Sequence, residues 1–231
     1  MGSAEEKNKI TGITDLPCSD EKTDLLNISK YVDGLQKFIE NCPTPMSIAI
    51  QGDWGTGKTS TINMLQNRLE AKEEKNIKCV YFNTWQYSQF NMSDNLYMSF
   101  VNSLVKKCCS KKDVAGEIKT YAQKACTKLV SGLIKDNIGL DMEELFKKQE
   151  EQMESVEKLK DAFSNMVKNE VDAQEDGRIV VFIDDLDRLN PEVAVELLEV
   201  IKLFMDVERC IFVLAIDYDR LLFCTSERKA N

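Results

Sequence analysis

The stretch that decides the fold is "GDWGTGKTS", residues 52–60. It fits the pattern G-x-x-x-x-G-K-[ST], in which Gly52 and Gly57 take the fixed glycine positions and Lys58 and Thr59 complete the motif. The apolar run "MSIAIQ" precedes it, and a helical pattern follows it. A strand, a glycine-rich turn and a helix N-terminus in this order predict a loop that can hold a phosphate chain.

Each residue type in this loop has a chemical role. The glycines let the backbone turn tightly, so that its N–H groups point at oxyanions. The lysine is expected to reach the β- and γ-phosphates, the threonine hydroxyl to bind Mg²⁺, and the last serine to help bind the α-phosphate. The predicted nucleotide-binding set is the whole loop: Gly52, Asp53, Trp54, Gly55, Thr56, Gly57, Lys58, Thr59 and Ser60.

A second motif, "IVVFIDDLDRL" at residues 179–189, joins an apolar run to a cluster of charges. Mg²⁺ needs anionic oxygen ligands, and Asp184 at the end of a buried strand is predicted to supply one, through water. Asp185 is placed to polarise an attacking water. Arg188 has two interpretations, a structural ion pair with Asp187 or a contact with the γ-phosphate of its own or a neighbouring subunit. The catalytic candidates are therefore Lys58, Asp184, Asp185 and Arg188.

Composition excludes several other classes of function. The net charge of −9 argues against a general nucleic-acid surface. The absence of histidine removes imidazole zinc sites and Ser-His catalysis, so carboxylates must act as bases. The eight cysteines form no C-x-x-C pair and indicate reduced thiols in a cytoplasmic protein. No apolar run approaches the roughly 18 residues of a membrane span, so none is expected.

Apolar runs alternate with helical patterns along the chain, which predicts an α/β fold with a parallel sheet. Residues 1–27 are expected to form an irregular arm. A helix is expected to follow, with Ile28, Tyr31, Val32, Leu35, Phe38 and Ile39 on one face. Residues 110–140 are ambiguous. Residues 141–170 are predicted to be a helix with an apolar stripe of Met153, Val156, Phe163 and Met166, which either packs on its own domain or forms a coiled coil with a partner.

Five segments, "GDWGTGKTS", "FNTWQYS", "VVFIDDLDRL", "ELLEVIKLF" and "FVLAIDYDRL", together resemble the KAP family of P-loop NTPases in both order and spacing. The resemblance runs from about residue 13 to residue 222. It implies a P-loop NTPase three-layer fold with a mostly parallel sheet, an additional strand between the P-loop strand and the metal strand, and a domain spanning residues 28–231. A helical insertion is expected at about residues 94–172.

The resemblance also implies roles for further residues. Asn83 and Trp85 belong to the family signature "FN-x-W", and a core position is one interpretation of Trp85. The residues themselves, apart from the resemblance, place Asp217 at the end of the strand expected beside the metal strand, where it either senses the γ-phosphate, orients water or caps a turn. Many family members carry transmembrane helices in the interval between the motifs, whereas here it is polar. No sequence for a further sheet strand or a helical lid follows residue 222, so a fragment of a longer protein is one interpretation.

The function expected from the motifs and the resemblance is Mg-dependent hydrolysis of ATP to ADP and phosphate, in a switch or scaffold module. The guanine-reading motif N-K-x-D is absent, which favours ATP over GTP. The family suggests bacterial anti-phage defence or signalling, with unidentified protein partners or self-association. Two alternatives stay open: a nucleotide-stabilised interaction module without turnover, and a small-molecule kinase.

Overall fold

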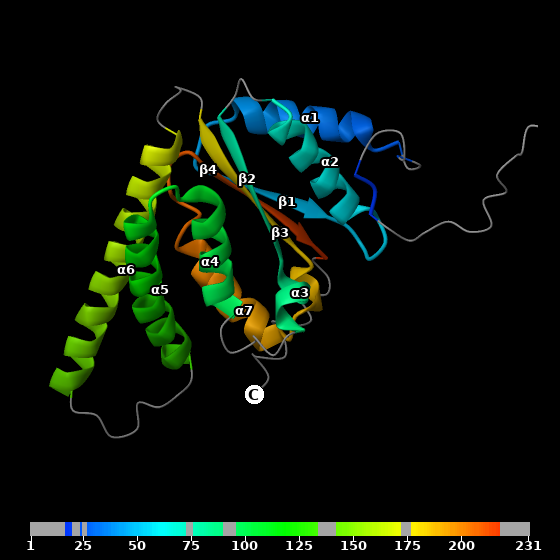
Figure 1. Ribbon diagram of the computed structural model, residues 1–231. Coiled ribbons are helices and arrows are strands. Elements are labelled where there is room, and N and C mark those ends of the chain that lie inside the picture. Colours follow the sequence, from blue (N-terminus) through cyan, green and yellow to red (C-terminus); the bar gives the residue numbers. More distant parts are fainter. Residues whose placement is uncertain are drawn as a thin grey trace, which may run out of the picture.

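Figure 1 shows the computed structural model of the chain, which describes residues 17–19, 24, 27–72, 76–89, 96–133, 142–171 and 177–217. For the helical residues 126–133 and 142–152 it describes the backbone alone. Most of the arm expected at residues 1–27 lies outside the described residues, and the few described ones belong to neither helix nor strand.

Four parallel strands form one sheet in the order β1-β4-β3-β2. They are β1 (Met46–Gln51), β2 (Ile77–Asn83), β3 (Arg178–Asp184) and β4 (Cys210–Ile216). β3 is buried along its whole length, as apolar β-branched runs in the centre of a parallel sheet should be. The strand β4 lies between the strand before the glycine-rich loop and the strand that ends in Asp184. The prediction of an additional strand at this position is therefore confirmed.

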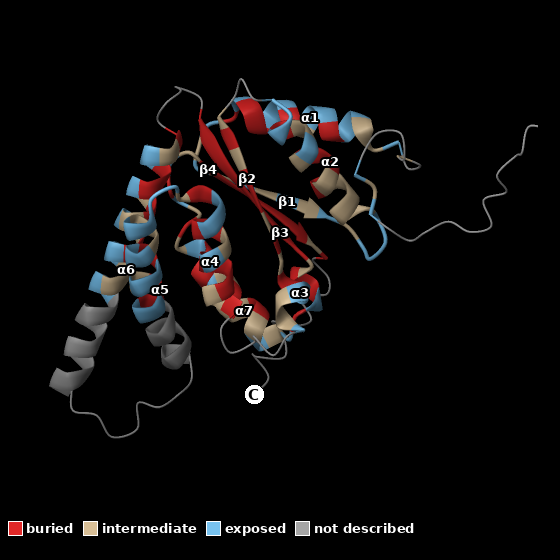
Figure 2. Ribbon diagram, in the orientation of Figure 1, coloured by how far each residue is buried: buried red, intermediate tan, exposed pale blue. Residues whose placement is uncertain are grey.

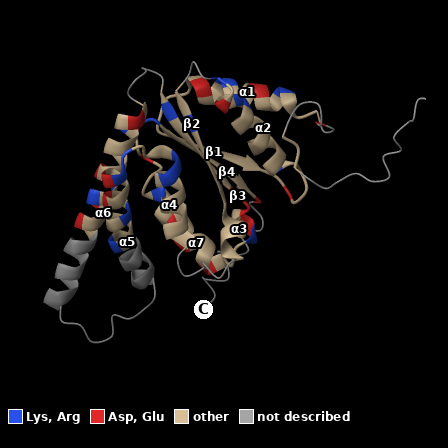
Figure 3. Cartoon of the chain, viewed as in Figure 1, with Lys and Arg blue, Asp and Glu red and all other residues tan. Residues whose placement is uncertain are grey.

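Helices cover both faces of the sheet and give three layers (Figure 1). On one face, α1 (Ser29–Asn41) and α2 (Lys58–Glu70) pack over Val180 and Phe182 of β3. On the other, α4 (Leu96–Cys108) and α7 (Pro191–Lys202) pack over Val181 and Ile183. Alternate residues of one strand thus enter two cores, as the two-residue repeat of a strand requires. Figure 2 shows the central strands almost entirely buried, and in Figure 3 charged residues lie mainly on the helices.

Two long helices, α5 (Lys112–Leu133) and α6 (Met142–Val171), lie between β2 and β3 in the sequence. They pack side by side against each other (Figure 1). The ambiguous interval thus contains a helix. The inner part of α6 enters the core, where the ring of Phe163 meets that of Phe204 edge-on at 4.7 Å. This contact favours packing on its own domain over a coiled coil with a partner. The predicted stripe is wrong at Met153, which is 66% exposed because α6 extends beyond the core there.

The apolar face predicted for α1 is also only partly right. Val32 and Ile39 are buried, but Tyr31 and Phe38 are exposed, because only a narrow stripe of α1 faces the rest of the molecule. The helix α1 ends at Asn41, just before Pro43 and Pro45, which cannot continue a helix. Asn190 caps the start of α7, where its side chain accepts a hydrogen bond from the backbone N–H of Glu192.

Candidate functional site

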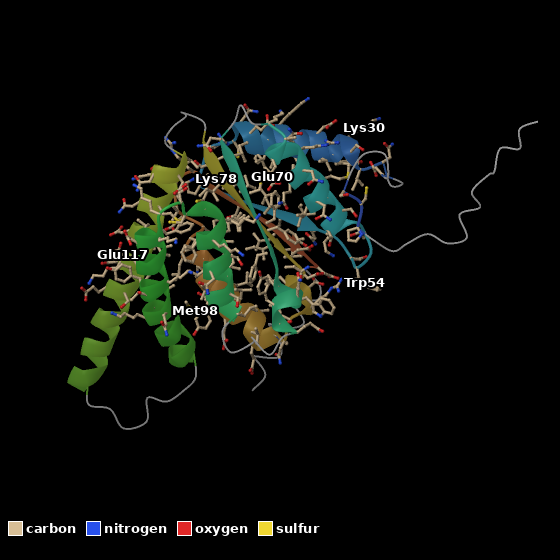
Figure 4. The ribbon with its side chains drawn as sticks, in the orientation of Figure 1. Lys30, Trp54, Glu70, Lys78, Met98 and Glu117 are labelled. Atoms are coloured by element: carbon tan, nitrogen blue, oxygen red, sulfur yellow. The ribbon has the colours of Figure 1, made fainter. Side chains whose placement is uncertain are left out.

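The glycine-rich loop joins β1 to α2 at the carboxyl end of the sheet, and Figure 4 shows Trp54 there, at the opposite end from Lys78. Gly55 and Gly57 have φ angles of 82° and 88°, in the left-handed region that favours glycine. A Cβ atom on Gly52 would lie 2.5 Å from the hydroxyl oxygen of Thr56. The two turns and this close approach explain why glycine is needed at these points.

Lys58 is the first residue of α2, and its ammonium group lies over the loop. Nζ donates hydrogen bonds to the carbonyl oxygens of Gly52 at 2.7 Å and Asp53 at 3.0 Å. The same point is the N-terminus of a 13-residue helix, whose dipole places partial positive charge there. Side chain and helix together make the loop attractive to an anion.

Asp184 ends β3 next to this loop and is 1% exposed. Its carboxylate accepts hydrogen bonds from the hydroxyl of Tyr81 at 3.0 Å and from the backbone N–H of Asp185 at 2.9 Å, and the side chain of Thr59 lies near it. Burial raises the pKa of Asp184 above its ordinary value, although the hydroxyls of Thr59 and Tyr81 act in the opposite direction. The two predicted metal residues, Thr59 and Asp184, therefore lie close together.

The oxygen atoms of Thr59 and Asp184 are donors of the kind that Mg²⁺ prefers. Mg²⁺ usually takes only one or two protein groups and fills its other positions with water and phosphate oxygens. Among the described residues, no group of three or more acidic, histidine or cysteine side chains could hold a metal on its own. A hydroxyl and a carboxylate that lie close together therefore fit Mg²⁺ bound together with a nucleotide.

Asp185 has a φ angle of 59° and begins the sharp turn into the short 3-10 helix η3 (Leu186–Arg188). Its Oδ1 forms an ion pair with Nε of Arg188 at 2.8 Å. Its Oδ2 accepts a hydrogen bond from Nδ2 of Asn83 at 2.8 Å. The sequence offered Asp187 as the ionic partner of Arg188, whereas the ion pair that the structure describes joins Arg188 to Asp185.

Trp85 is not a core residue, which corrects the interpretation made from the sequence. It lies on the short helix α3 (Thr84–Ser88) and is 39% exposed. The guanidinium carbon of Arg188 lies 5.3 Å from the centre of its ring. These two residues, with Trp54 and Asp187, line an open pocket of about 450 Å³.

Two other predicted residues lie at the edge of the site. The hydroxyl of Ser60 accepts a hydrogen bond from the backbone N–H of Cys18 at 3.0 Å, so it anchors the segment that precedes α1. Asp217 is buried and follows β4, beside the strand that carries Asp184.

Sequence reasoning gave no role to Tyr81 and Thr84, and only a family resemblance to Asn83. The register of β2 on β3 pairs Asn83 with Asp184. Tyr81 then reaches the Asp184 carboxylate, and the hydroxyl of Thr84 donates to the backbone carbonyl of Asp184 at 3.0 Å. The only signal for these contacts in the sequence is that a second strand ends in polar residues.

A glycine-rich loop before a helix, a lysine over that loop and a buried aspartate beside it define a P-loop nucleotide-binding protein. The chain belongs to the KAP family of P-loop domains: residues 28–228 match the family model described as "KAP family P-loop domain". Membership in this family indicates nucleotide binding. A search of curated proteins found no match to the chain.

In the part of the chain that the structure describes, no helix combines the length and the apolar character that crossing a membrane requires.

Proposed function

We propose that this chain binds Mg-ATP and slowly hydrolyses it to ADP and phosphate, as a conformational switch or scaffold module. The observation that carries the proposal is the position of the buried Asp184 carboxylate, at the end of β3, beside Thr59 on the helix after the glycine-rich loop. This arrangement places a buried carboxylate next to a phosphate-binding element. The KAP family membership supports the same conclusion.

Residues of the chain itself would perform most of the work. Lys58 and the N–H groups of the loop would bind the phosphate oxygens, and Thr59 and Asp184 would hold Mg²⁺. When bound, Mg²⁺ neutralises charge on the β- and γ-phosphates. Asp185 would orient and polarise the attacking water, since it is the second carboxylate at the end of the same strand.

Arg188 would act within its own subunit. Its ion pair with Asp185 and its stacking on Trp85 support this assignment, because they hold the guanidinium group beside the carboxylate proposed to polarise the attacking water. Arg188 lines the same pocket as Trp54, a residue of the glycine-rich loop. Its positively charged guanidinium group therefore lies on the side of the site where phosphate would bind. ATP is preferred over GTP because the guanine-reading motif is absent. A biological role in bacterial anti-phage defence or in signalling is supported by the family resemblance alone.

The proposal is tested by phosphate release from ATP and from GTP, with and without Mg²⁺. We expect release from ATP that requires Mg²⁺ and a lower rate with GTP. A chain that binds neither nucleotide in calorimetry would contradict the proposal as a whole.

Asp185→Asn separates the switch from a nucleotide-stabilised interaction module. Asparagine tolerates the left-handed backbone at this position, so the turn should persist. We expect hydrolysis to fall at least about a hundredfold while ATP still binds. If the variant hydrolyses ATP at the wild-type rate, Asp185 is not the catalytic carboxylate. If wild type binds ATP but releases no phosphate, the interaction module is the better explanation.

A further inference from the structure

The carboxylate of Asp185 is held from two sides by groups on different elements. Arg188 approaches Oδ1 from η3 at 2.8 Å, and Asn83 approaches Oδ2 from the end of β2 at 2.8 Å. One donor alone would leave the carboxylate free to turn about its bond to the Cβ atom. Two donors on opposite oxygens fix its plane, and each oxygen keeps a lone pair for a water molecule.

Asn83 is itself fixed at both ends of its amide. Its Oδ1 accepts a hydrogen bond from the backbone N–H of Gln86 at 2.9 Å and so caps the first turn of α3. Because an N–H donor faces that end, the oxygen must lie there, and the amide nitrogen must face Asp185. The orientation of the donor is therefore set by the backbone of α3.

The same helix closes the network on its other side. Trp85, on α3, stacks against the guanidinium group of Arg188, which in turn pairs with Asp185. The contacts form a closed ring around one carboxylate, and this ring runs through Asp185, Asn83, α3, Trp85 and Arg188. Such a ring resists rotation of the Asp185 side chain more than either polar contact would alone.

We propose that Asn83 is a positioning residue for ATP hydrolysis: its amide fixes the plane of the Asp185 carboxylate so that an attacking water is aligned. This inference rests on the function proposed above. Asn83 acts through Asp185 and takes no part in binding the phosphates, which is the work of Lys58 and the loop. Loss of its amide should therefore lower kcat and leave KM nearly unchanged.

A purely structural role, the capping of α3, is the competing explanation, and Asn83→Ser separates the two. Serine is as good an N-cap as asparagine, but its short side chain cannot also reach Asp185. We expect kcat for Mg-ATP to fall about tenfold, the value of one hydrogen bond to a charged group, with KM within about twofold of wild type. An unchanged or increased kcat, or a loss confined to KM, would overturn the proposal.

Asn83→Asp provides a second variant in case the serine variant does not fold. It keeps the capping oxygen and the side-chain size, but it replaces the donor with a carboxylate that repels Asp185. We expect a larger fall in kcat than with serine. A rate equal to that of the wild type would contradict the proposal independently.

A double-mutant cycle with Asp185→Asn shows whether Asn83 acts through Asp185. If it does, adding Asn83→Ser to Asp185→Asn should cause little further loss, less than about twofold. A further tenfold loss in that background would assign Asn83 a role independent of Asp185 and overturn the inference.

Binding of a non-hydrolysable Mg-ATP analogue, measured by calorimetry, gives a readout that does not depend on turnover. We expect the same Kd, within about twofold, for wild type and Asn83→Ser, and a weaker Kd for the serine variant would contradict a role confined to Asp185. If the wild type itself releases no phosphate, the proposed function fails. If the wild type is active and the serine variant equals it, only this inference fails.

Discussion

Gly57 stands at the junction of the loop and α2, where its φ angle of 88° lets the loop turn directly into the helix. Gly57→Ala should strain this junction by about 1–2 kcal/mol, because an L side chain in the left-handed region meets its own backbone. We expect a lower free energy of unfolding and weaker binding of Mg-ATP, measured by urea denaturation and calorimetry.

Gly34→Ala is the matched control for this prediction. Gly34 lies within α1, and an added Cβ would meet no atom within 4 Å. Alanine there should raise the free energy of unfolding by about 0.5–1 kcal/mol, because it lowers the entropy cost of forming the helix. Equal effects at both glycines would contradict the role assigned to the turn at Gly57.

At the scale of single residues, the sequence predicts the position of a candidate residue where its neighbours in the chain define a motif. Lys58 and Thr59 belong to a continuous motif, and Asp184 ends an apolar run that leads to the edge of the sheet. The contact between Asn83 and Asp185 could not be predicted in this way, since 102 positions separate them. It depends on β2 lying next to β3, which no local pattern specifies.

At the scale of elements, α6 is held to the core by its inner part. Phe163 is fully buried and its ring packs on Phe204. Phe163→Ala should lower the free energy of unfolding by about 3–5 kcal/mol, the cost of a large cavity in an apolar core. Urea denaturation followed by circular dichroism measures this loss.

Met153 on the same helix supplies the comparison. It is mostly exposed, so Met153→Ala should change the free energy of unfolding by no more than about 0.5 kcal/mol. A large loss at Met153, or a small one at Phe163, would show that α6 packs differently. Periodicity could not separate these two residues, because a helical repeat continues where α6 leaves the core.

Glu170, near the end of α6, links this helix to β2 and to the connection between α4 and α5, and makes the stability depend on pH. Its carboxylate accepts hydrogen bonds from Lys78 of β2 at 2.6 Å and from the backbone and hydroxyl of Ser110, both at 2.7 Å. Burial opposes its ionisation, but the contacts with Lys78 and Ser110 prevail and hold the pKa of Glu170 at about 2, below its ordinary 4.5.

A lowered pKa in the folded state means that Glu170 stabilises the fold above pH 4.5 and loses this contribution as the pH falls toward 2. Glu170→Gln should therefore cost about 1–3 kcal/mol at pH 6, and the difference from wild type should shrink steadily below pH 4.5. Urea denaturation across this range measures it. A difference at Glu170 that does not vary with pH would contradict the assignment.

At the scale of the whole molecule, one arrangement explains how distant motifs form one site. Parallel strands end at the same edge of the sheet. The glycine-rich loop follows β1, Asn83 ends β2, and Asp184 and Asp185 lie at the end of β3, so all three groups lie at that edge. The alternation of apolar runs and helical patterns was enough to predict this architecture. The family resemblance, rather than periodicity, predicted that β4 would lie between β1 and β3.

The long insertion was harder to predict from the sequence than the sheet. Helices α4, α5 and α6 form a second core with β3 and α7. The inner part of α6 contributes Phe163 to this core, and Val156 packs against it. Charged and polar residues interrupt the apolar positions over residues 110–140, so the apolar pattern there was too weak to define a helix. Packing against neighbouring helices supplies the stabilisation that the local sequence does not.

The central claim is that Lys58 and its loop bind ATP for hydrolysis, and phosphate release with Mg-ATP on wild type and Lys58→Ala tests it most directly. Lys30→Ala, at an exposed position on α1, serves as the control for loss of one positive charge. We predict Mg-dependent release by wild type and Lys30→Ala, and a rate at least about a hundredfold lower for Lys58→Ala. Equal rates for Lys58→Ala and wild type, or no release by wild type above the blank, would contradict the account.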